Sequence, residues 1–349
     1  MNGREQGGIL RLNADGSVDE SFQPGSGPAL LDISCCPYVY AIALLPDGRI
    51  LVGGVFDTVS GEPRKSLARL NSDGGLDPAF ATGVELLNGD SHAVEARVQV
   101  LVPDGAGGIF VGGYFHLFGG VPRNHLARLN PDGSVDPNFT PTMNSAGSVE
   151  KLIVQSDGRV LISGSFWFPP DGTVRSVARL DSDGTFDPTF PASQLFELHL
   201  LTQDSGDKLI GAQPSYGWFA GHYQPSPNII RLSSDGFVDS TFARSVLSPG
   251  SSVRAALTLP DGDIVIAGDF ATVNDIPRPM LARLYGGSAE PLRLVSVGFE
   301  QGTLLFQAQI PSGVRYSLEY SDSLRAASWQ VVTNGVGDGT LKVFHDPVP

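Results

Sequence analysis

Residues 11–22 read RLNADGSVDESF, and this stretch decides the fold because it returns four more times along the chain. A sixth Arg-Leu pair, at Arg283, is followed by a different sequence. An element that returns about every 50–60 residues is typical of a repeat protein. The four further copies are RLNSDGGLDPAF (69–80), RLNPDGSVDPNF (128–139), RLDSDGTFDPTF (179–190) and RLSSDGFVDSTF (231–242).

A second recurring element lies between the copies and has the pattern of a β-hairpin. It reads ALLPDGRILVGGVF at 43–56, where a Pro-Asp-Gly turn separates two apolar segments. The second segment is apolar on both faces, so we expect neighbouring sheets to cover both of its sides. The glycine pair Gly53-Gly54 that follows predicts a close approach of another part of the chain. Related runs stand at 100–115, 153–166, 201–213 and 258–270.

Each unit therefore supplies about four strands, namely two from the hairpin, one from the Arg-Leu run and one from the Val-Asp-Pro-x-Phe run. Four-stranded units repeated around an axis are the blades of a β-propeller. We predict an all-β fold with a propeller of about five four-stranded blades over residues 1–287. Residues 8–22 would complete the blade formed by residues 256–285, and the alternative is a fragment of a longer array.

The repeat pattern ends after Tyr285. Residues 286–291, GGSAEP, predict a linker, and short alternating strands are expected from Leu292 onward. Residues 292–349 are therefore predicted to form a small, truncated β-sandwich, which we expect to be the less stable part of the chain.

The motifs RLN-x-DGS-x-D-P-x-F and LPDGRILVGG-x-F together resemble those of the bacterial delta-60 repeat family over roughly residues 8–285. The fourth unit departs most, because Asp204-Ser205-Gly206 replaces the Pro-Asp-Gly turn and Gly211-Ala212 replaces the glycine pair. The resemblance implies an exported bacterial protein, extracellular or at the cell surface, without family-wide catalytic residues. The tail, with YSLEYSDSL (316–324) and Trp329, is similar to β-sandwich modules near the C-termini of exported bacterial proteins.

Composition narrows the possible partners. The net charge is −14, with 23 Lys and Arg against 37 Asp and Glu, so nucleic acid and anionic membrane surfaces are not expected to bind. No apolar run is long enough to span a membrane, and the first ten residues lack the apolar core of a signal peptide. Cys35 and Cys36 are adjacent and predict no disulfide framework. We expect the isolated repeat region to be monomeric.

No catalytic motif is present, so no catalytic residue, metal or cofactor is predicted. The six histidines lack metal-ligand spacing, and neither a nucleophile elbow nor a phosphate loop occurs. The stretch 11–22 shares Asn13, Asp15, Gly16 and Asp19 with calcium loops. Arg11 and Phe22, however, stand where such a loop needs carboxylates, so the stretch is better interpreted as a turn, with calcium binding as the minor alternative. The recurrent aspartates are expected to cap turns or to meet the recurrent arginines.

Binding is expected where the units differ, because loops on a rigid scaffold carry function. Exposed aromatic side chains stack on sugars or anchor protein partners, although ordinary packing is the alternative for each of them. We predict a non-enzymatic scaffold or adhesion module with a protein or glycan partner. The alternatives are a carbohydrate- or peptide-binding propeller and, less favoured, a polysaccharide hydrolase or lyase. The candidate ligand-binding residues are Trp167, Tyr216, Trp218, His222 and Tyr223.

Overall fold

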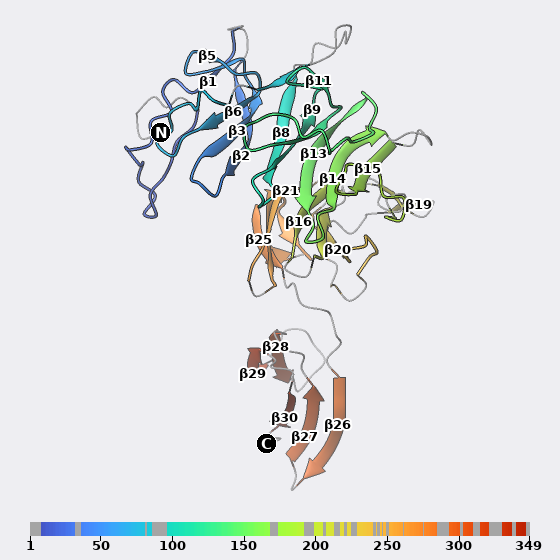
Figure 1. The fold of residues 1–349 in the computed structure, drawn as a ribbon. Coiled ribbons are helices and arrows are strands. Elements are labelled where there is room, and N and C mark those ends of the chain that lie inside the picture. Colours follow the sequence, from blue (N-terminus) through green and yellow to red (C-terminus); the bar gives the residue numbers. More distant parts are fainter. Residues whose placement is uncertain are drawn as a thin grey trace. The chain divides into compact units, whose positions relative to one another are not determined.

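Every regular element in the part of the chain that the computed structural model describes is a β-strand (Figure 1). The chain divides into two compact units, Met1–Ser226 with Leu232–Phe237, and Pro227–Arg231 with Val238–Pro349. The described residues are 8–31, 36–80, 82–85, 96–167, 174–191, 199–204, 207–212, 217–219, 222–224, 229–239, 242, 245, 247–248, 251–260, 262–274, 276–284, 293–300, 303–309, 315–320, 330–336 and 340–346.

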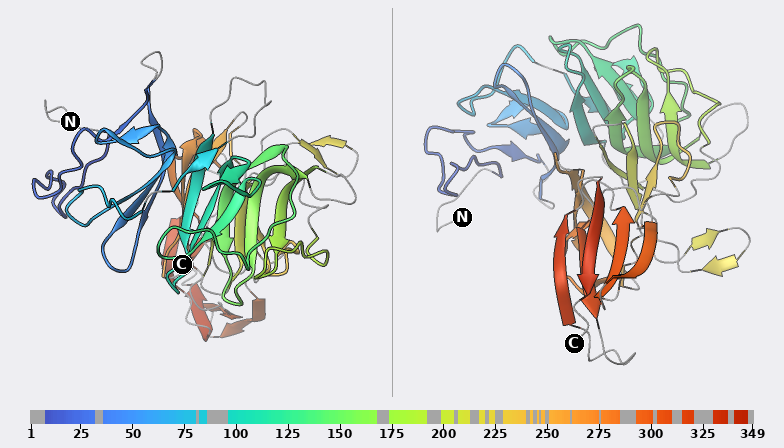
Figure 2. Two further views of the ribbon diagram at one scale, coloured as in Figure 1. Left: turned by 45° about the horizontal axis from the view of Figure 1, so that its top comes forward. Right: turned by 90° about the horizontal axis from the view of Figure 1, so that it is seen from below.

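The first unit contains three successive antiparallel sheets of three strands, each built from a predicted hairpin and an Arg-Leu strand (Figures 1 and 2). The hairpin predicted at residues 201–213 is also present. It consists of β16 (His199–Gln203) and β17 (Leu209–Ala212), which pair in antiparallel orientation. The three sheets are β2-β3-β6 (Tyr38–Leu44, Ile50–Val55, Leu67–Leu70), β8-β9-β12 (Arg97–Pro103, Ile109–Tyr114, Leu126–Leu129) and β13-β14-β15 (Gly147–Val154, Val160–Trp167, Val174–Leu180).

Successive sheets pack face to face, as the apolar middle strands predict. Leu51 and Val52 of β3 are fully buried, and β8 lies against both β2 and β3. A Cβ atom on Gly53 would lie 2.5 Å from Cγ1 of Val98, and one on Gly112 would lie 2.8 Å from Cγ1 of Val149. The predicted close approach at the glycine pair is therefore confirmed, and the neighbour is the first strand of the next sheet.

Small two- and three-stranded sheets stand beside the main ones. In the first unit they have the orders β1-β4-β5 and β7-β10-β11, so the segment that follows one copy pairs with a short hairpin of the next unit of the repeat. Leu247 forms the equivalent bridge to Val273 in the second compact unit. The strands are β1 (Pro28–Ala29), β4 (Thr58–Val59), β5 (Glu62–Pro63), β7 (Val84–Glu85), β10 (Leu117–Phe118), β11 (Val121–Pro122), β23 (Thr272–Val273) and β24 (Ile276–Pro277).

The prediction that the Val-Asp-Pro-x-Phe run forms a fourth strand in each blade is wrong for the described residues. The Val-Asp-Pro-x-Phe run makes one β-bridge to the Arg-Leu strand, at Leu70–Leu76 for example, and no ladder. The cause is a local turn. The Asp77 N–H donates to the carbonyl of Arg69, and the Phe80 N–H donates to the carbonyl of Asp77, so the chain turns instead of continuing along the Arg-Leu strand. The other bridges are Leu12–Val18, Leu129–Val135 and Leu180–Phe186.

The second unit contains β20 (Ile229–Leu232, shared at its last residue with the first unit) and the fifth sheet, β21-β22-β25 (Ser252–Thr258, Ile264–Asp269, Leu281–Leu284). All three strands of this sheet come from residues 252–284, so residues 8–22 are not needed to complete it. The number of blades and the closure of the ring stay predictions.

Five strands follow in the C-terminal segment, where short strands were expected from Leu292 onward. They form a three-stranded sheet, β26-β27-β30 (Arg293–Glu300, Thr303–Gln309, Leu341–Asp346), and a pair, β28-β29 (Arg315–Tyr320, Gln330–Val336). Their packing as a sandwich stays a prediction. The predicted linker at 286–291 lies outside the described residues, and the predicted domain boundary there also stays a prediction.

Candidate functional site

The recurrent arginine and aspartate of each copy form an ion pair. In four copies the arginine Nε donates to Oδ2 of the aspartate eight residues later, and in the third copy along the chain Nη1 of Arg128 does so at 2.8 Å. The side chains of Arg69 and Arg179 are only 4% and 3% exposed, so these pairs are buried. The expected meeting of arginine and aspartate is confirmed. The four Nε–Oδ2 distances are 2.8 Å for Arg11–Asp19, 2.8 Å for Arg69–Asp77, 2.7 Å for Arg179–Asp187 and 2.9 Å for Arg231–Asp239.

The same guanidinium joins its copy to the next one. Nη1 of Arg69 donates to the carbonyl of Pro131, and Nη1 of Arg179 donates to the carbonyl of Ser234, in each case in the Asp-Gly turn of the following copy. The guanidinium also lies over the phenylalanine that ends its own copy, at 4.4 Å for Arg69 and Phe80. Similar stacks, at 4.8–5.0 Å, involve Arg11 with Phe22, Arg179 with Phe190 and Arg231 with Phe242.

A second arginine supports two of the pairs. Arg49 lies between Asp47 of the hairpin turn and Asp77, and Arg159 holds the same place in the third sheet. Burial alone would raise the pKa of Asp77, but the hydrogen bonds from Arg69 and from the Ala79 N–H outweigh it, so the pKa lies below its usual value. These charged side chains therefore stabilise the contacts within the repeats.

The Asn-x-Asp-Gly stretches are turns, as interpreted from the sequence. Oδ1 of Asp132 accepts hydrogen bonds from the N–H and the hydroxyl of Ser134, at 2.9 and 2.6 Å, which closes the turn. Gly133 has φ +90°, a backbone conformation that suits glycine. Within the described residues, no group of three or more His, Cys, Asp or Glu side chains is placed to hold a metal ion.

A pair of histidines is buried beside the second sheet. The ring centroids of His116 and His125 lie 5.7 Å apart, and the ring of Tyr114 stacks on His125 at 5.8 Å. His125 is fully buried, and neither ring nitrogen has a hydrogen bond of standard geometry. Burial, aided by the neighbouring His116, lowers the pKa of His125 to about 4 despite the nearby backbone of Asn144 and Ser145. The two histidines stand nine positions apart in one unit, a spacing that matches no metal-ligand motif and did not predict that their rings would meet.

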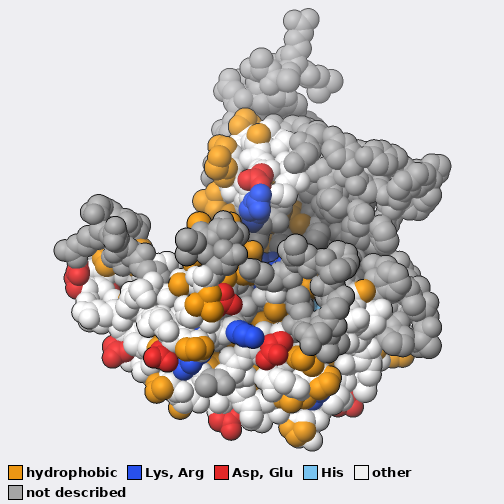
Figure 3. Space-filling view, turned by 90° about the horizontal axis from the view of Figure 1, so that it is seen from above, with side chains coloured by type: hydrophobic (Ala, Val, Ile, Leu, Met, Phe, Trp, Pro, Cys, Tyr) orange, Lys and Arg blue, Asp and Glu red, His pale blue; other side chains and the backbone are white. Residues whose placement is uncertain are grey.

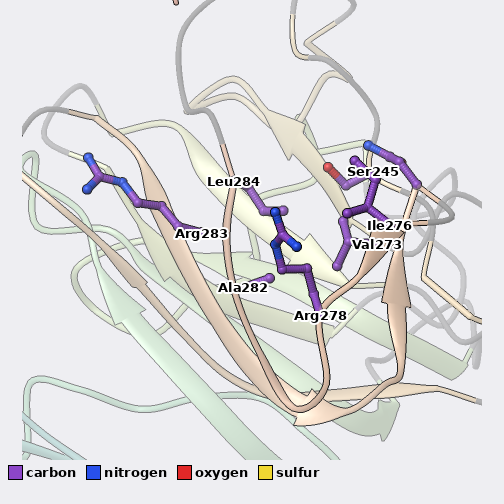
Figure 4. Close-up of a pocket in the computed structure, with 8 residues that line it drawn as sticks. Ser245, Val273, Ile276, Arg278, Ala282, Arg283 and Leu284 are labelled. Atoms are coloured by element: carbon purple, nitrogen blue, oxygen red, sulfur yellow. The ribbon is translucent and has the colours of Figure 1, made fainter. Parts of the chain in front are cut away.

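Two cavities adjoin the short hairpins. One of about 220 Å³ lies beside β25 in the second unit, and Figure 4 shows side chains around it. They come from β23, β24 and β25, from Asn274 and Arg278 next to these strands, and from Ser245. A wider depression of about 500 Å³ lies beside β10 and β11 in the first unit. Neither was predicted. The first is lined by Ser245, Val273, Asn274, Ile276, Arg278, Ala282, Arg283 and Leu284, and the second by Ala79, Thr82, Gly119, Val121, Asp132, Gly133, Ser134 and Val135.

The four predicted ligand-binding residues that the structure describes lie on three strands. Trp167 ends β14, where its Cα partner is Val174 of β15. Trp218 and Tyr223 are Cα partners across the hairpin of β18 (Gly217–Phe219) and β19 (His222–Gln224), and His222 faces Phe219 in the same ladder. The structure thus brings Trp218, His222 and Tyr223 together on one hairpin, while Trp167 stands on another sheet. Tyr216 lies outside the described residues.

Charges are dispersed over the surface. Figure 3 shows few described acidic and basic side chains on one face, spread among uncharged ones, and several of the basic side chains lie next to an acidic one. Among the described residues, no helix is long and apolar enough to cross a membrane.

One family model matches the chain in six segments that follow the repeats. It is the model described as "Domain of unknown function (DUF5122) beta-propeller", and its segments add up to a little over half of the chain. The chain belongs to this family. The assignment fits the recurrent sheets and the ion pair in every copy, both of which fall largely within the matched segments. These segments are 1–22, 45–80, 107–139, 155–190, 217–242 and 259–284.

No curated protein matches the chain. Among solved structures, puromycin hydrolase is similar at 16% identity and a TM-score of 0.41, over 97% of this chain but only 50% of that one. The chain thus spans half the length of this structure. A catalytically inactive variant of virginiamycin B lyase from Staphylococcus aureus with quinupristin matches at 12% identity and a TM-score of 0.33, over 78% and 92% of the two chains. A GH43 β-1,3-galactosidase with galactodeoxynojirimycin matches at 12% identity and a TM-score of 0.31, over 84% and 95%.

Proposed function

We propose that this DUF5122 β-propeller chain is a non-enzymatic interaction scaffold of an exported bacterial protein. The proposal rests on one observation, which is that the recurrent charged residues contact one another and the backbone of the next copy. Arg69 and Arg179 each donate to an aspartate of their own copy and to a backbone carbonyl of the next copy. Residues used in this way stabilise the array and leave the non-repeated segments to contact a partner.

One segment that differs between the described units is the connection after the middle strand of each sheet. The first, second and fifth units have a short two-stranded hairpin there, such as β4-β5 or β10-β11. The fourth unit has the β18-β19 hairpin instead, with Trp218 opposite Tyr223. Aromatic residues on a hairpin suit stacking against a sugar ring or a protein side chain. Trp167, Tyr216, Trp218, His222 and Tyr223 are therefore the residues that we assign to the ligand.

A panel of glycans and of surface-protein fragments tests this function. We expect the chain to bind at least one member without converting it, and the Trp218→Ala, Tyr223→Ala double variant to lose that binding while its melting temperature stays unchanged. The Tyr38→Ala, Tyr40→Ala double variant is the matched control, because these tyrosines are half exposed and lie on β2, a different strand of the repeat. Turnover of a polysaccharide, or binding that survives the first double variant, would contradict the proposal.

The extracellular or cell-surface location belongs to the same proposal and rests on the resemblance of the repeats. It is tested by fractionating the producing bacterium and by probing intact cells with an antibody. We expect the protein in the medium or on the cell surface, and recovery from the cytoplasm alone would contradict this location.

A further inference from the structure

The first three sheets are joined by two junctions of the same kind. Leu101 of β8, in the second sheet, is 7% exposed and packs in the core cluster that contains Leu51 and Leu67 of the first sheet. Leu152 of β13, in the third sheet, is equally buried in the cluster that contains Phe110 of the second sheet. Each junction therefore joins a leading face, which points toward the preceding sheet, to a trailing face, which points toward the following one.

The leading face of the first sheet is exposed along β2. Ile42 pairs with Val52 of β3. Leu101 holds the same register position in the second sheet, where its partner is Val111 of β9. Ile42 is nevertheless 58% exposed, and Leu44, two positions further along the strand on the same face, is exposed as well. A position that is buried at both junctions of the first three sheets thus carries an exposed apolar side chain here.

The trailing face of the fifth sheet is exposed in the same way. Leu281 of β25 holds the register position that Leu67 holds in the first sheet. Leu67 is fully buried, whereas Leu281 is 61% exposed. Leu257 of β21 is also exposed, although Ala43, its equivalent in the first sheet, is buried. The two halves of a recurrent junction are therefore both present on this chain as exposed apolar faces.

We propose that the trailing face of the fifth sheet of one chain docks on the leading face of the first sheet of a second chain. Chains then associate head to tail through the kind of junction that already joins the first sheet to the second. Such a contact uses different surfaces on its two sides, so a chain that has bound one partner keeps a free face, and assembly continues beyond the dimer.

The composition of the two faces favours a second chain as the partner. An outer face of a repeat array that stays free in solution is normally polar, but these two carry leucine and isoleucine. Ala267 stands where the first sheet has Gly53 and the third has the fully buried Ser163, so a small side chain is accommodated at this position of a junction. The sequence predicted a monomeric repeat region, and the exposed faces are the reason to depart from that prediction. Both faces are separate from the aromatic hairpin of the fourth unit, so their test is independent of the one above.

Sedimentation velocity of the whole chain over a series of concentrations tests the proposal. We expect the wild-type chain to form species larger than a dimer, whose share grows with concentration. Ile42→Asp alters the leading face and Leu281→Asp the trailing face. Each variant alone should associate at least about tenfold more weakly than the wild type, because a charge replaces an apolar side chain that the contact buries. An equal mixture of the two variants should associate again but stop at the dimer, because each variant retains one intact face.

Leu31→Asp is the matched control, because Leu31 is an exposed apolar residue that lies outside the first and fifth sheets. This variant should associate like the wild type, and circular dichroism verifies that each variant is folded. A wild-type chain that stays monomeric at every concentration would overturn the proposal, as it would if the two faces met within one chain. Association that survives both single variants, or a mixture that forms no dimer, would overturn it as well.

Discussion

In three copies one arginine makes three kinds of contact, and the planar guanidinium explains why it is arginine rather than lysine. Its several N–H donors reach a carboxylate and a carbonyl together, and its face stacks on an aromatic ring. Arg69 does this with Asp77, Pro131 and Phe80 while almost fully buried. A lysine offers one compact ammonium group and could not satisfy all three partners.

The second sheet shows how this arrangement adapts. Its hairpin turn lacks the arginine found at Arg49 and Arg159, and has Gly108 in the corresponding place directly before the middle strand. Arg128 instead contacts Asp104 of that turn as well as Asp136, and it lies over Phe110 at 5.6 Å. The different sequence of this turn thus redirects the arginine without loss of the pair.

His125 makes the stability of the first unit depend on pH. Its pKa of about 4 in the folded chain lies below the ordinary value of 6.5, so the unfolded chain binds the proton more readily between these values. Folded-state stability is therefore lost as the pH falls from 6.5 toward 4. The loss between pH 7 and 5 amounts to about 2 kcal/mol. The neighbouring charged or titratable groups are His116, Tyr114 and, over the ring of Tyr114, Arg97.

We expect the His125→Met variant to lose this part of the pH dependence. Methionine fits the backbone, because Met280 has φ +63° at the equivalent place of the fifth unit, close to φ +64° at His125. Urea unfolding at pH 7 and pH 5 measures the change. The wild-type chain should lose about 2 kcal/mol more than the variant over this range, and equal losses would contradict the assignment.

At the scale of the strands, packing between sheets depends on the absence of a side chain at Gly53. The Gly53→Val variant would drive its side chain into Val98 and Leu101 of the next sheet. Overpacking of this kind costs about 1–3 kcal/mol, so the urea midpoint should fall. An unchanged midpoint would show that the two sheets do not pack as closely as described.

At Gly75, in contrast to Gly53, a side chain should be tolerated. Ser17 and Ser134 hold its position in other copies, and there the hydroxyl donates to the aspartate two residues earlier, at 2.6 Å. Gly75→Ser should place a hydroxyl beside Asp73, whose Oδ1 already accepts the Gly75 N–H. Replacing glycine also reduces the entropy of the unfolded chain, so the melting temperature should stay the same or rise by a few degrees. A clear fall would show that this turn differs from those of the other copies.

The hairpins could be predicted from sequence because each depends on a short local signal. The turn residues at Asp47-Gly48 and Asp157-Gly158 and the apolar runs beside them lie within a few positions of each other. The small sheets could not be predicted, since strands of two residues such as β4 have no periodicity. The prediction of a fourth strand in each blade was wrong, because the alternating residues of the Val-Asp-Pro-x-Phe run are equally compatible with a turn closed by the aspartate.

Two features of the candidate sites depend on tertiary contacts and therefore could not be predicted from the sequence. The ring of His125 meets those of His116 and Tyr114 only because the chain folds back through β10 and β11. The cavity beside β25 is lined by residues from Ser245 to Leu284 that come together only in the fold. The ion pairs, in contrast, followed from a constant spacing of eight residues in every copy.

At the scale of the whole molecule, an excess of acidic residues coexists with few clustered charges. The net charge is −14, yet the aspartates of the repeats are paired with arginines of the same copy or closed into turns. An array of this kind gains stability from each copy and from each junction between neighbouring copies. Equivalent changes in different copies should consequently have comparable effects.

The most direct test of this account is the free energy of urea unfolding of three variants, Asp77→Asn, Asp136→Asn and Asp187→Asn. Each removes a carboxylate that is less than a tenth exposed and breaks the arginine-aspartate pair of its copy, although Arg128 keeps Asp104 and Arg179 keeps Asp235 as a second carboxylate. Such a change costs about 3–5 kcal/mol when the pair is buried. The Asp269→Asn variant is the control, since its pair with Arg254 is exposed and should contribute less than about 1 kcal/mol. The account predicts a large loss for all three repeat variants, and losses no greater than that of the control would contradict it.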